Sequence, residues 1–261
     1  MRSIFLTVAI SLMFAAPAPA RAEVQGEAVE YRDGDTVLEG FLAYDDAVQG
    51  QRPGVLVVHE WKGLNDYARG RAKQLAGMGY IAFAIDMYGK GVLAKDHDEA
   101  AKLSGVYRSD RQLMRRRAKA GLEILRGQAL LDPARVAAIG YCFGGTTALE
   151  LGRAGEELKG IATFHAGLSN PDPSDAKNFK CPVLVMHGAA DNFTNVEVPG
   201  FEMEMKAAGS NYRLIKYPGA VHSFTVPEAG DDPSTGMAYN ADADKQSWEE
   251  LTKFLAEIFK A

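Results

Sequence analysis

The stretch that decides the fold is Gly140-Tyr141-Cys142-Phe143-Gly144-Gly145. It follows the apolar run 136–139 and precedes a segment of helical character that begins at Thr146. In the G-x-S-x-G pattern a nucleophile occupies a sharp turn between a strand and a helix, and glycines leave room for that turn. The stretch predicts such a unit with a cysteine as the nucleophile. A buried structural cysteine in a glycine-rich turn fits the same pattern.

Outward from this turn, apolar runs alternate with helical patterns. Strands are expected over residues 54–59, 80–85, 136–139, 161–164, 183–187 and 213–217, and helices over 67–76, 96–107, 110–126, 198–208 and 240–259. Residues 27–31 and 36–43 alternate around Asp33-Gly34, which predicts a hairpin at a sheet edge. The alternation indicates an α/β protein whose mostly parallel central sheet carries helices on both faces.

The composition excludes several classes of protein. The chain has 261 residues, of which 47% are hydrophobic and 24% charged, so disordered and fibrous classes do not apply. The formal net charge is -5, and no stripe of Lys and Arg with interleaved aromatic residues is present, so we do not expect a nucleic-acid partner. The one basic cluster, residues 115–117, lies within an amphipathic helical pattern. We expect it on the solvent-exposed face of that helix and not in a binding patch.

The first residues have the form of a targeting segment. Arg2 precedes the uncharged apolar run 4–16, and Ala20-Arg21-Ala22 resembles a signal peptidase site. We predict a signal peptide over residues 1–22 and one domain over 23–261, in a periplasmic or secreted protein without stable membrane association after cleavage. An uncleaved N-terminal anchor is the alternative, although the apolar run is short for a membrane span.

Export would permit a disulfide, and the chain has two cysteines, Cys142 and Cys181. Cys181 stands at the start of the expected strand 183–187, whereas Cys142 follows the end of its own strand. A parallel sheet would hold the two sulfur atoms far beyond the Cα separation of about 4.4–6.8 Å that a disulfide needs. We therefore expect both thiols to be free.

A cysteine nucleophile needs a base and a group that orients the base. Asp191 follows the strand 183–187, and His222 follows the strand 213–217. Both are expected at the carboxyl edge of the sheet, where open α/β sheets build their sites. Their order after Cys142 is the nucleophile, acid, histidine order of one known hydrolase fold.

An oxyanion hole needs two converging amide donors. The amide of Phe143, directly after the nucleophile, is one, and the loop after the strand 54–59 offers the amide of Trp61. Glu60 precedes Trp61, and a carboxylate beside a thiol can hold or accept its proton. An exposed, idle carboxylate is the alternative for Glu60.

These motifs resemble the dienelactone hydrolase family of α/β-hydrolases over essentially the whole chain after residue 22. The resemblance rests on His59-Glu60-Trp61-Lys62-Gly63, Asp86-Met87-Tyr88, the stretch 140–145, His187-Gly188-Ala189-Ala190-Asp191 and Tyr217-Pro218-Gly219-Ala220-Val221-His222-Ser223-Phe224. It implies a Cys142, His222, Asp191 triad, with Glu60 contacting the resting thiol. It also implies hydrolysis of an ester or lactone through an acyl-cysteine intermediate.

One departure bears on the substrate. In the family that these motifs resemble, the members that cleave dienelactone bind the substrate carboxylate with two arginines. The matching positions in this chain hold Lys90 and Val226. We therefore expect another small ester, lactone or thioester. Lys90 is predicted to bind substrate because it stands at one of these matching positions and keeps a positive charge. Tyr88 and Phe224 are predicted to line the substrate pocket because they adjoin the active-site loops.

Neither a cofactor nor a metal is expected, because the histidines lack metal-ligand spacing. A thioesterase or general carboxylesterase with the same triad is an alternative. A ligand-binding protein that keeps the fold without turnover is another. The oligomeric state is left open.

Overall fold

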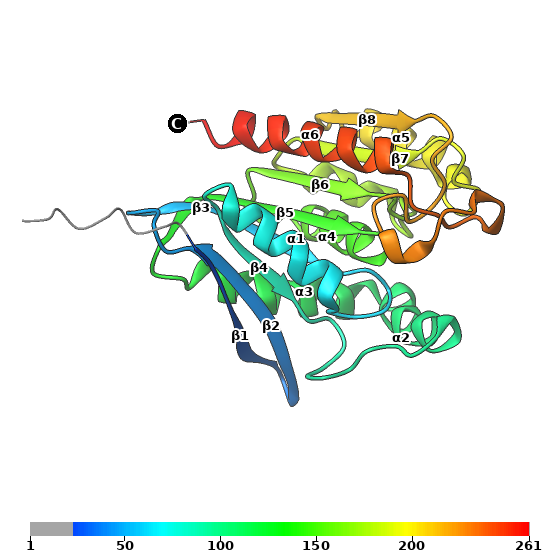
Figure 1. The fold of residues 1–261 in the computed structure, drawn as a ribbon. Coiled ribbons are helices and arrows are strands. Elements are labelled where there is room, and N and C mark those ends of the chain that lie inside the picture. Colours follow the sequence, from blue (N-terminus) through cyan, green and yellow to red (C-terminus); the bar gives the residue numbers. More distant parts are fainter. Residues whose placement is uncertain (1–22, 261) are drawn as a thin grey trace, which may run out of the picture.

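A computed structural model describes residues 23–260, so the expected signal peptide lies outside the described residues. Eight strands form one sheet in the order β1-β2-β4-β3-β5-β6-β7-β8 (Figure 1). The strands are β1 Val24–Asp33, β2 Thr36–Asp45, β3 Arg52–Val58, β4 Ile81–Ile85, β5 Leu131–Tyr141, β6 Gly160–Phe164, β7 Val183–Gly188 and β8 Tyr212–Tyr217. β1 pairs with β2, and β2 with β4, in antiparallel fashion, and every other neighbouring pair is parallel.

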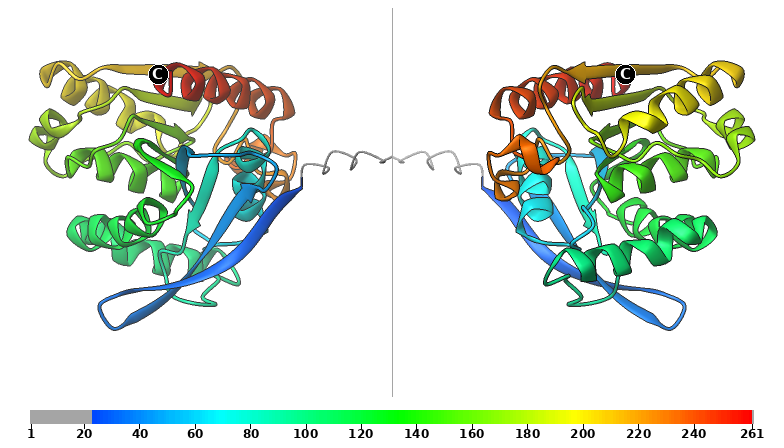
Figure 2. Two further views of the ribbon diagram at one scale, coloured as in Figure 1. Left: turned by 90° about the vertical axis from the view of Figure 1, so that its left-hand side faces the viewer. Right: turned by 90° about the vertical axis from the view of Figure 1, so that its right-hand side faces the viewer.

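Helices cover both faces of the sheet (Figures 1 and 2). They are α1 Asp66–Gly77, α2 His97–Ser109, α3 Arg111–Arg126, α4 Phe143–Arg153, α5 Val198–Ala207 and α6 Ala241–Ile258. α1 and α6 pack their apolar residues into the core on one face, and α3, α4 and α5 pack theirs on the other. The expected mostly parallel sheet with helices on both faces is confirmed.

The helices begin at the polar residues that the sequence provides as caps. The side chains of Asn65, Asp96, Asp110 and Asn240 each accept a hydrogen bond from a backbone N–H in the first turn of α1, α2, α3 and α6. The central strands β3 to β7 have few exposed side chains, because both faces are covered. The capping residues thus mark where these helices begin, and burial on both faces marks the central strands.

The strands β1, β2 and β5 extend beyond their predicted bounds. β1 and β2 pair over ten residues each, longer than the predicted hairpin. β5 begins at Leu131 instead of residue 136, because Leu131 pairs with Arg52 and a register shift follows between Arg52 and Gly54. The intervening residues Asp132-Pro133-Ala134-Arg135 interrupt the apolar run, so the sequence does not reveal this extension. The long loop expected over 218–236 contains two short 3-10 turns, Pro227–Ala229 and Pro233–Thr235.

Within residues 23–260, no helix is both long enough and apolar enough to cross a membrane.

Candidate active site

The turn between β5 and α4 holds Cys142 in a backbone conformation rare for L-residues, with φ of 51°. Glycines make the turn possible. A Cβ atom at Gly140 would lie 2.0 Å from the carbonyl oxygen of Gly144, and one at Gly144 would lie 2.2 Å from the carbonyl oxygen of Val58. The strand–turn–helix unit expected around Cys142 is therefore present. At its glycines, backbone atoms approach so closely that a side chain would not fit.

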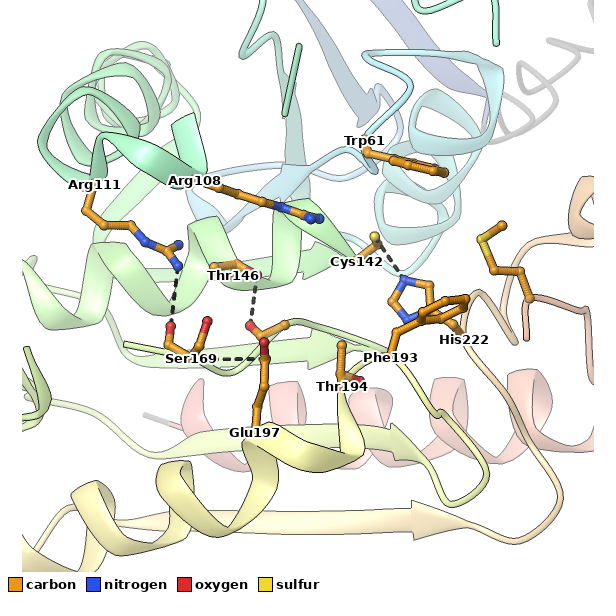
Figure 3. A pocket seen from close by; sticks show the side chains of 12 residues that line it. Trp61, Arg108, Arg111, Cys142, Thr146, Ser169, Phe193, Thr194, Glu197 and His222 are labelled. Atoms are coloured by element: carbon orange, nitrogen blue, oxygen red, sulfur yellow. Dashed lines mark hydrogen bonds between the residues drawn. The ribbon is translucent and has the colours of Figure 1, made fainter. Parts of the chain in front are cut away.

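Cys142, His222 and Asp191 form one hydrogen-bonded network, of which Figure 3 shows the contact between Cys142 and His222. The Nε2 atom of His222 lies 3.0 Å from the Sγ atom of Cys142, and its Nδ1 atom lies 2.8 Å from Asp191 Oδ2. All three residues are buried, and they follow the carboxyl ends of β5, β8 and β7. This geometry joins a thiol, a base and an orienting carboxylate.

The carboxylate of Asp191 is positioned by several hydrogen bonds. Its Oδ1 accepts hydrogen bonds from the backbone N–H groups of Phe193 and Thr194, and its Oδ2 accepts one from the hydroxyl of Thr194. Burial opposes ionisation, but the hydrogen bonds from His222 and Thr194 lower the pKa of Asp191 to about 2. The carboxylate is therefore charged at neutral pH and orients the imidazole.

His222 sits between two groups that favour its protonated form. Burial alone would lower its pKa, but the negative charge available at Cys142 and the hydrogen bond to Asp191 raise the pKa of His222 well above its ordinary value. His222 thus places a group that can take up and return a proton within hydrogen-bond reach of the Cys142 sulfur.

Glu60 lies in the loop after β3 and is also buried. Its Oε1 accepts a hydrogen bond from the hydroxyl of Ser223 at 3.3 Å, and burial raises the pKa of Glu60. The Cys142 thiol contacts His222 instead. The arrangement thus differs from the resting contact between Glu60 and Cys142 that the resemblance implies.

The two residues expected to offer oxyanion donors adjoin the thiol. Phe143 is the first residue of α4, so its N–H is one of those at a helix start that have no partner within the helix. Trp61 lines the cavity that contains Cys142, and its carbonyl oxygen accepts a hydrogen bond from the hydroxyl of Tyr88 at 2.9 Å. That bond fixes the loop that carries the Trp61 amide.

The three predicted substrate-binding side chains do not line the cavity around Cys142. Lys90 is bound to Glu30 and Glu39 on the β1–β2 hairpin, at 2.8 and 3.2 Å. Tyr88 is buried beneath the Trp61 loop, and Phe224 is fully buried against His165. The structure therefore places these three side chains outside this cavity, and their binding of a substrate stays a prediction.

The cavity measures about 400 Å³. Besides Trp61 and the reactive pair Cys142 and His222, it is lined by Arg108, Arg111, Thr146, Gly167, Ser169, Phe193, Thr194, Glu197 and Met237. The sequence analysis missed these residues because most lie on helices or in loops outside the motifs. Two arginines three residues apart, on either side of the break between α2 and α3, were the signal available.

His165 is a further residue that the sequence analysis missed. Its ring is buried 5.3 Å from the His222 ring, and its Nδ1 lies 3.8 Å from Glu60 Oε1. Burial lowers the pKa of His165 well below its ordinary value, so it is neutral. In the described part of the chain, Cys142, His165 and Ser223 are the non-glycine residues with positive φ, and such strain clusters at functional sites.

Both cysteines are free, as expected. Residues 23–260 contain no group of three or more His, Cys, Asp or Glu residues that could hold a metal ion.

A nucleophile on a strand–turn–helix unit, with its acid and histidine at later strand ends of a mostly parallel sheet, defines the α/β-hydrolase fold. The family model for the dienelactone hydrolase family matches residues 38–259. The chain belongs to the dienelactone hydrolase family.

Solved structures and curated relatives agree with this assignment. The chain is 40% identical to the structure titled m3DLH, with a TM-score of 0.87 and coverage of 91% of this chain and 99% of that one. It is 39% identical to a dienelactone hydrolase-like promiscuous phosphotriesterase from metagenomic libraries, with a TM-score of 0.86 and the same coverage. It is 26% identical to the "Putative carboxymethylenebutenolidase" of Aquifex aeolicus (strain VF5), covering 90% of this chain and all of that protein. These relatives indicate a hydrolase.

Proposed function

We propose that the protein hydrolyses a small carboxylic ester or lactone through an acyl-cysteine intermediate. The observation that carries this proposal is the 3.0 Å contact between Cys142 Sγ and His222 Nε2, with Asp191 on the far side of the imidazole. The contact is within the range expected for a nucleophile and its base.

In the acylation step, the Cys142 thiolate attacks the carbonyl carbon and an S–C bond forms. The amides of Phe143 and Trp61 hold the oxyanion that develops on the carbonyl oxygen. The C–O bond to the leaving group then breaks, and the proton on His222 Nε2 passes to the departing oxygen. Asp191 keeps the imidazole in the orientation that these transfers need.

In the deacylation step, a water molecule gives a proton to His222 and attacks the thioester carbon. The C–S bond breaks, the carboxylic acid leaves, and the thiolate and imidazolium are restored. Glu60 is a positioning residue in this scheme, because it binds the hydroxyl of Ser223, the residue after His222. The protein would need neither a metal nor another cofactor.

The names of two relatives support this reaction class. One is named as a carboxymethylenebutenolidase and the other as a promiscuous phosphotriesterase. Lys90 and Val226 stand where dienelactone-cleaving members carry arginines, which favours a different substrate. Lactones, esters, thioesters and a phosphotriester therefore belong in one substrate panel.

The test compares wild-type protein with Cys142→Ala and His222→Ala on 4-nitrophenyl esters, lactones, acyl-thioesters and a phosphotriester. Cys181→Ala is the matched control, because Cys181 is the other free, buried cysteine and lies outside the cavity. We expect turnover by wild type and Cys181→Ala, loss of turnover in the other two variants, and a mass increase on Cys142 with slow substrates. Turnover that survives Cys142→Ala would overturn the proposed nucleophile, and no turnover at all would favour a binding protein.

We also propose that residues 1–22 are a signal peptide and that the protein works in the periplasm or is secreted. The form of Arg2, the apolar run 4–16 and Ala20-Arg21-Ala22 supports this. Mass spectrometry of the protein from fractionated cells should find a chain that begins at Glu23. An intact Met1 in the cytosolic fraction would contradict it.

A further inference from the structure

Arg108 and Arg111 differ from the other arginines near them. On α3, Arg115 pairs with Glu150 at 2.7 Å and Arg117 pairs with Asp33 at 2.8 Å. Arg108 and Arg111 have no ion-pair partner within residues 23–260, yet both line the cavity that contains Cys142. Two guanidinium groups without carboxylate partners therefore face the reactive thiol.

The guanidinium of Arg111 makes only weak contacts, and one of its hydrogen-bond donors has no partner. Its Nη2 donates a hydrogen bond to the carbonyl oxygen of Ser169 at 3.4 Å, which is long, and its Nη1 contacts the sulfur of Met114 at 3.6 Å. Its Nε is buried without any partner. Partial burial lowers the pKa of Arg111; the charge of Glu150 opposes this shift, and the charges of Arg153 and Arg108 add to it. A partly buried cation that forms no ion pair is incompletely compensated, and an incoming anion would supply the missing partner.

Two other polar side chains of the cavity, Glu197 and Thr146, already have hydrogen-bond partners. Glu197 is the carboxylate of this wall, and its Oε2 accepts hydrogen bonds from the amides of Leu168 and Ser169. The hydroxyl of Thr146 donates to the carbonyl oxygen of Gly167. With two cations against one amide-bound carboxylate, this part of the cavity favours a negatively charged ligand.

The position of the arginines relative to His222 decides which part of a substrate they meet. Figure 3 shows Arg108 and Arg111 on one side of Cys142 and His222 on the opposite side. The leaving group must depart next to His222, because it takes its proton from the imidazole. The acyl part of the substrate, which stays on Cys142, therefore extends toward Arg108 and Arg111.

We propose that Arg108 and Arg111 bind a carboxylate at the far end of the acyl chain, so that the preferred substrates are half-esters of dicarboxylic acids. This inference rests on the proposed function and names the substrate class of the same site. Guanidinium groups bind carboxylates with charge-assisted hydrogen bonds of matching planar geometry. The two residues are specificity-determining, and the bonds made and broken at Cys142 are those of the acyl-cysteine scheme.

The test uses pairs of esters that differ only in one charge. 4-Nitrophenyl hydrogen adipate and suberate carry the charge on the acyl side, and their methyl-capped esters are neutral. 4-Acetoxybenzoate and its methyl ester form the pair with the charge on the leaving group. The readout is the ratio of kcat/KM for the charged and neutral members of each pair, corrected for spontaneous hydrolysis.

We expect the wild-type ratio to favour the charged acyl chain by about tenfold or more, as one or two charge-assisted hydrogen bonds allow. Arg108→Gln and Arg111→Gln should each lower this ratio, the double variant should bring it to about one, and Arg→Lys at either position should restore part of it. Lys102→Gln removes an exposed charge from α2 outside the cavity and should keep the wild-type ratio.

The outcomes separate this inference from the proposed function. Turnover of neutral esters that depends on Cys142, with a wild-type ratio of one, would overturn the carboxylate site and leave the hydrolase intact. A preference for the charged leaving group that is lost in the arginine variants would overturn the acyl-side orientation. Absence of turnover for every ester would count against the proposed function itself. Adipate that inhibits wild type competitively, and the double variant more weakly, would support the site without relying on turnover of charged esters.

Discussion

At the scale of single residues, the chain contains two thiols in opposite environments. Cys142 lies 3.0 Å from an imidazole whose raised pKa favours the imidazolium, whereas burial raises the pKa of Cys181 to about 12. Since the thiolate is the form that reacts with alkylating agents, the two side chains should differ in reactivity although both are buried.

We therefore expect iodoacetamide at neutral pH to modify Cys142 in the folded protein at least about a hundredfold faster than Cys181. Peptide mass spectrometry over a time course measures both rates. Unfolding in urea is the control, because both thiols should then react alike. Equal slow labelling in the folded state would contradict the activated Cys142.

Because the pKa of Asp191 is low in the folded protein, we expect the free energy of unfolding to fall in acid. In the unfolded chain an aspartate titrates near pH 4, whereas the folded pKa is about 2. The carboxylate therefore stabilises the fold fully above pH about 4, and a contribution of about 2 kcal/mol is lost as the pH falls from about 4 to about 2.

Asp191→Asn should lack that part of the decline in the free energy of unfolding, measured with urea between pH 4 and 2. His222 is protonated throughout this range in both states, so it adds nothing to the difference. Asp231→Asn, in an exposed loop, is the control and should follow wild type. An unchanged decline in Asp191→Asn would contradict the depressed pKa.

The sequence predicts the reacting residues of the site better than its walls. Cys142, Asp191 and His222 each follow a strand end, and the carboxyl ends of parallel strands meet at one edge, so their convergence follows from the order of elements. Whether Tyr88 and Phe224 face the cavity depends on side-chain packing, which no local pattern records. Arg108 and Arg111 reach the cavity from a helix pair whose placement over the sheet is a tertiary feature.

At the scale of elements, the turn between β5 and α4 depends on close backbone contact. Gly140→Ala would place a Cβ atom 2.0 Å from the carbonyl oxygen of Gly144, which is backbone and cannot move aside. We expect a loss of about 3 kcal/mol in the free energy of unfolding, together with a misplaced thiol and reduced turnover.

Gly70→Ala provides the matched control. Gly70 lies within α1, and a Cβ atom there would meet nothing within 4 Å. Because alanine favours helix over glycine, this variant should gain about 0.5–1 kcal/mol. Urea unfolding monitored by circular dichroism measures both changes, and equal effects of the two substitutions would refute the role given to close contact at the turn.

Among the elements, the apolar central strands were the most predictable, because burial on both faces leaves an uninterrupted apolar run. β5 shows the limit. Its first residue, Leu131, pairs with Arg52 of β3, and a register shift over the following residues separates this pairing from the apolar run that starts at Val136. Pairing partners distant in sequence decided that boundary.

At the scale of the whole molecule, Arg71 on α1 connects parts of the chain that are far apart in sequence. Its guanidinium donates to Asp244 on α6 and to the carbonyl oxygen of Thr225 at 3.0 Å. Thr225 belongs to the loop that carries His222, so this cation ties the first and last helices to the site.

Arg71→Met should cost about 3 kcal/mol in the free energy of unfolding, because it leaves Asp244 and the Thr225 carbonyl without their partner. Arg213→Met is the control, since Arg213 is half exposed and lies 3.6 Å from Glu250, a pair expected to contribute less than about 1 kcal/mol. Urea titrations give both values. A cost for Arg71→Met no larger than that for Arg213→Met would argue against the link.

The order of the network along the chain also affects when the protein becomes reactive. Cys142 is synthesised eighty residues before His222, and the imidazole reaches the sulfur only when β8 has paired with β7. A growing or partly refolded chain therefore has the Cys142 thiol without the base that contacts it in the folded protein. Assembly of the proposed catalytic network is thus completed by pairing of the last strand.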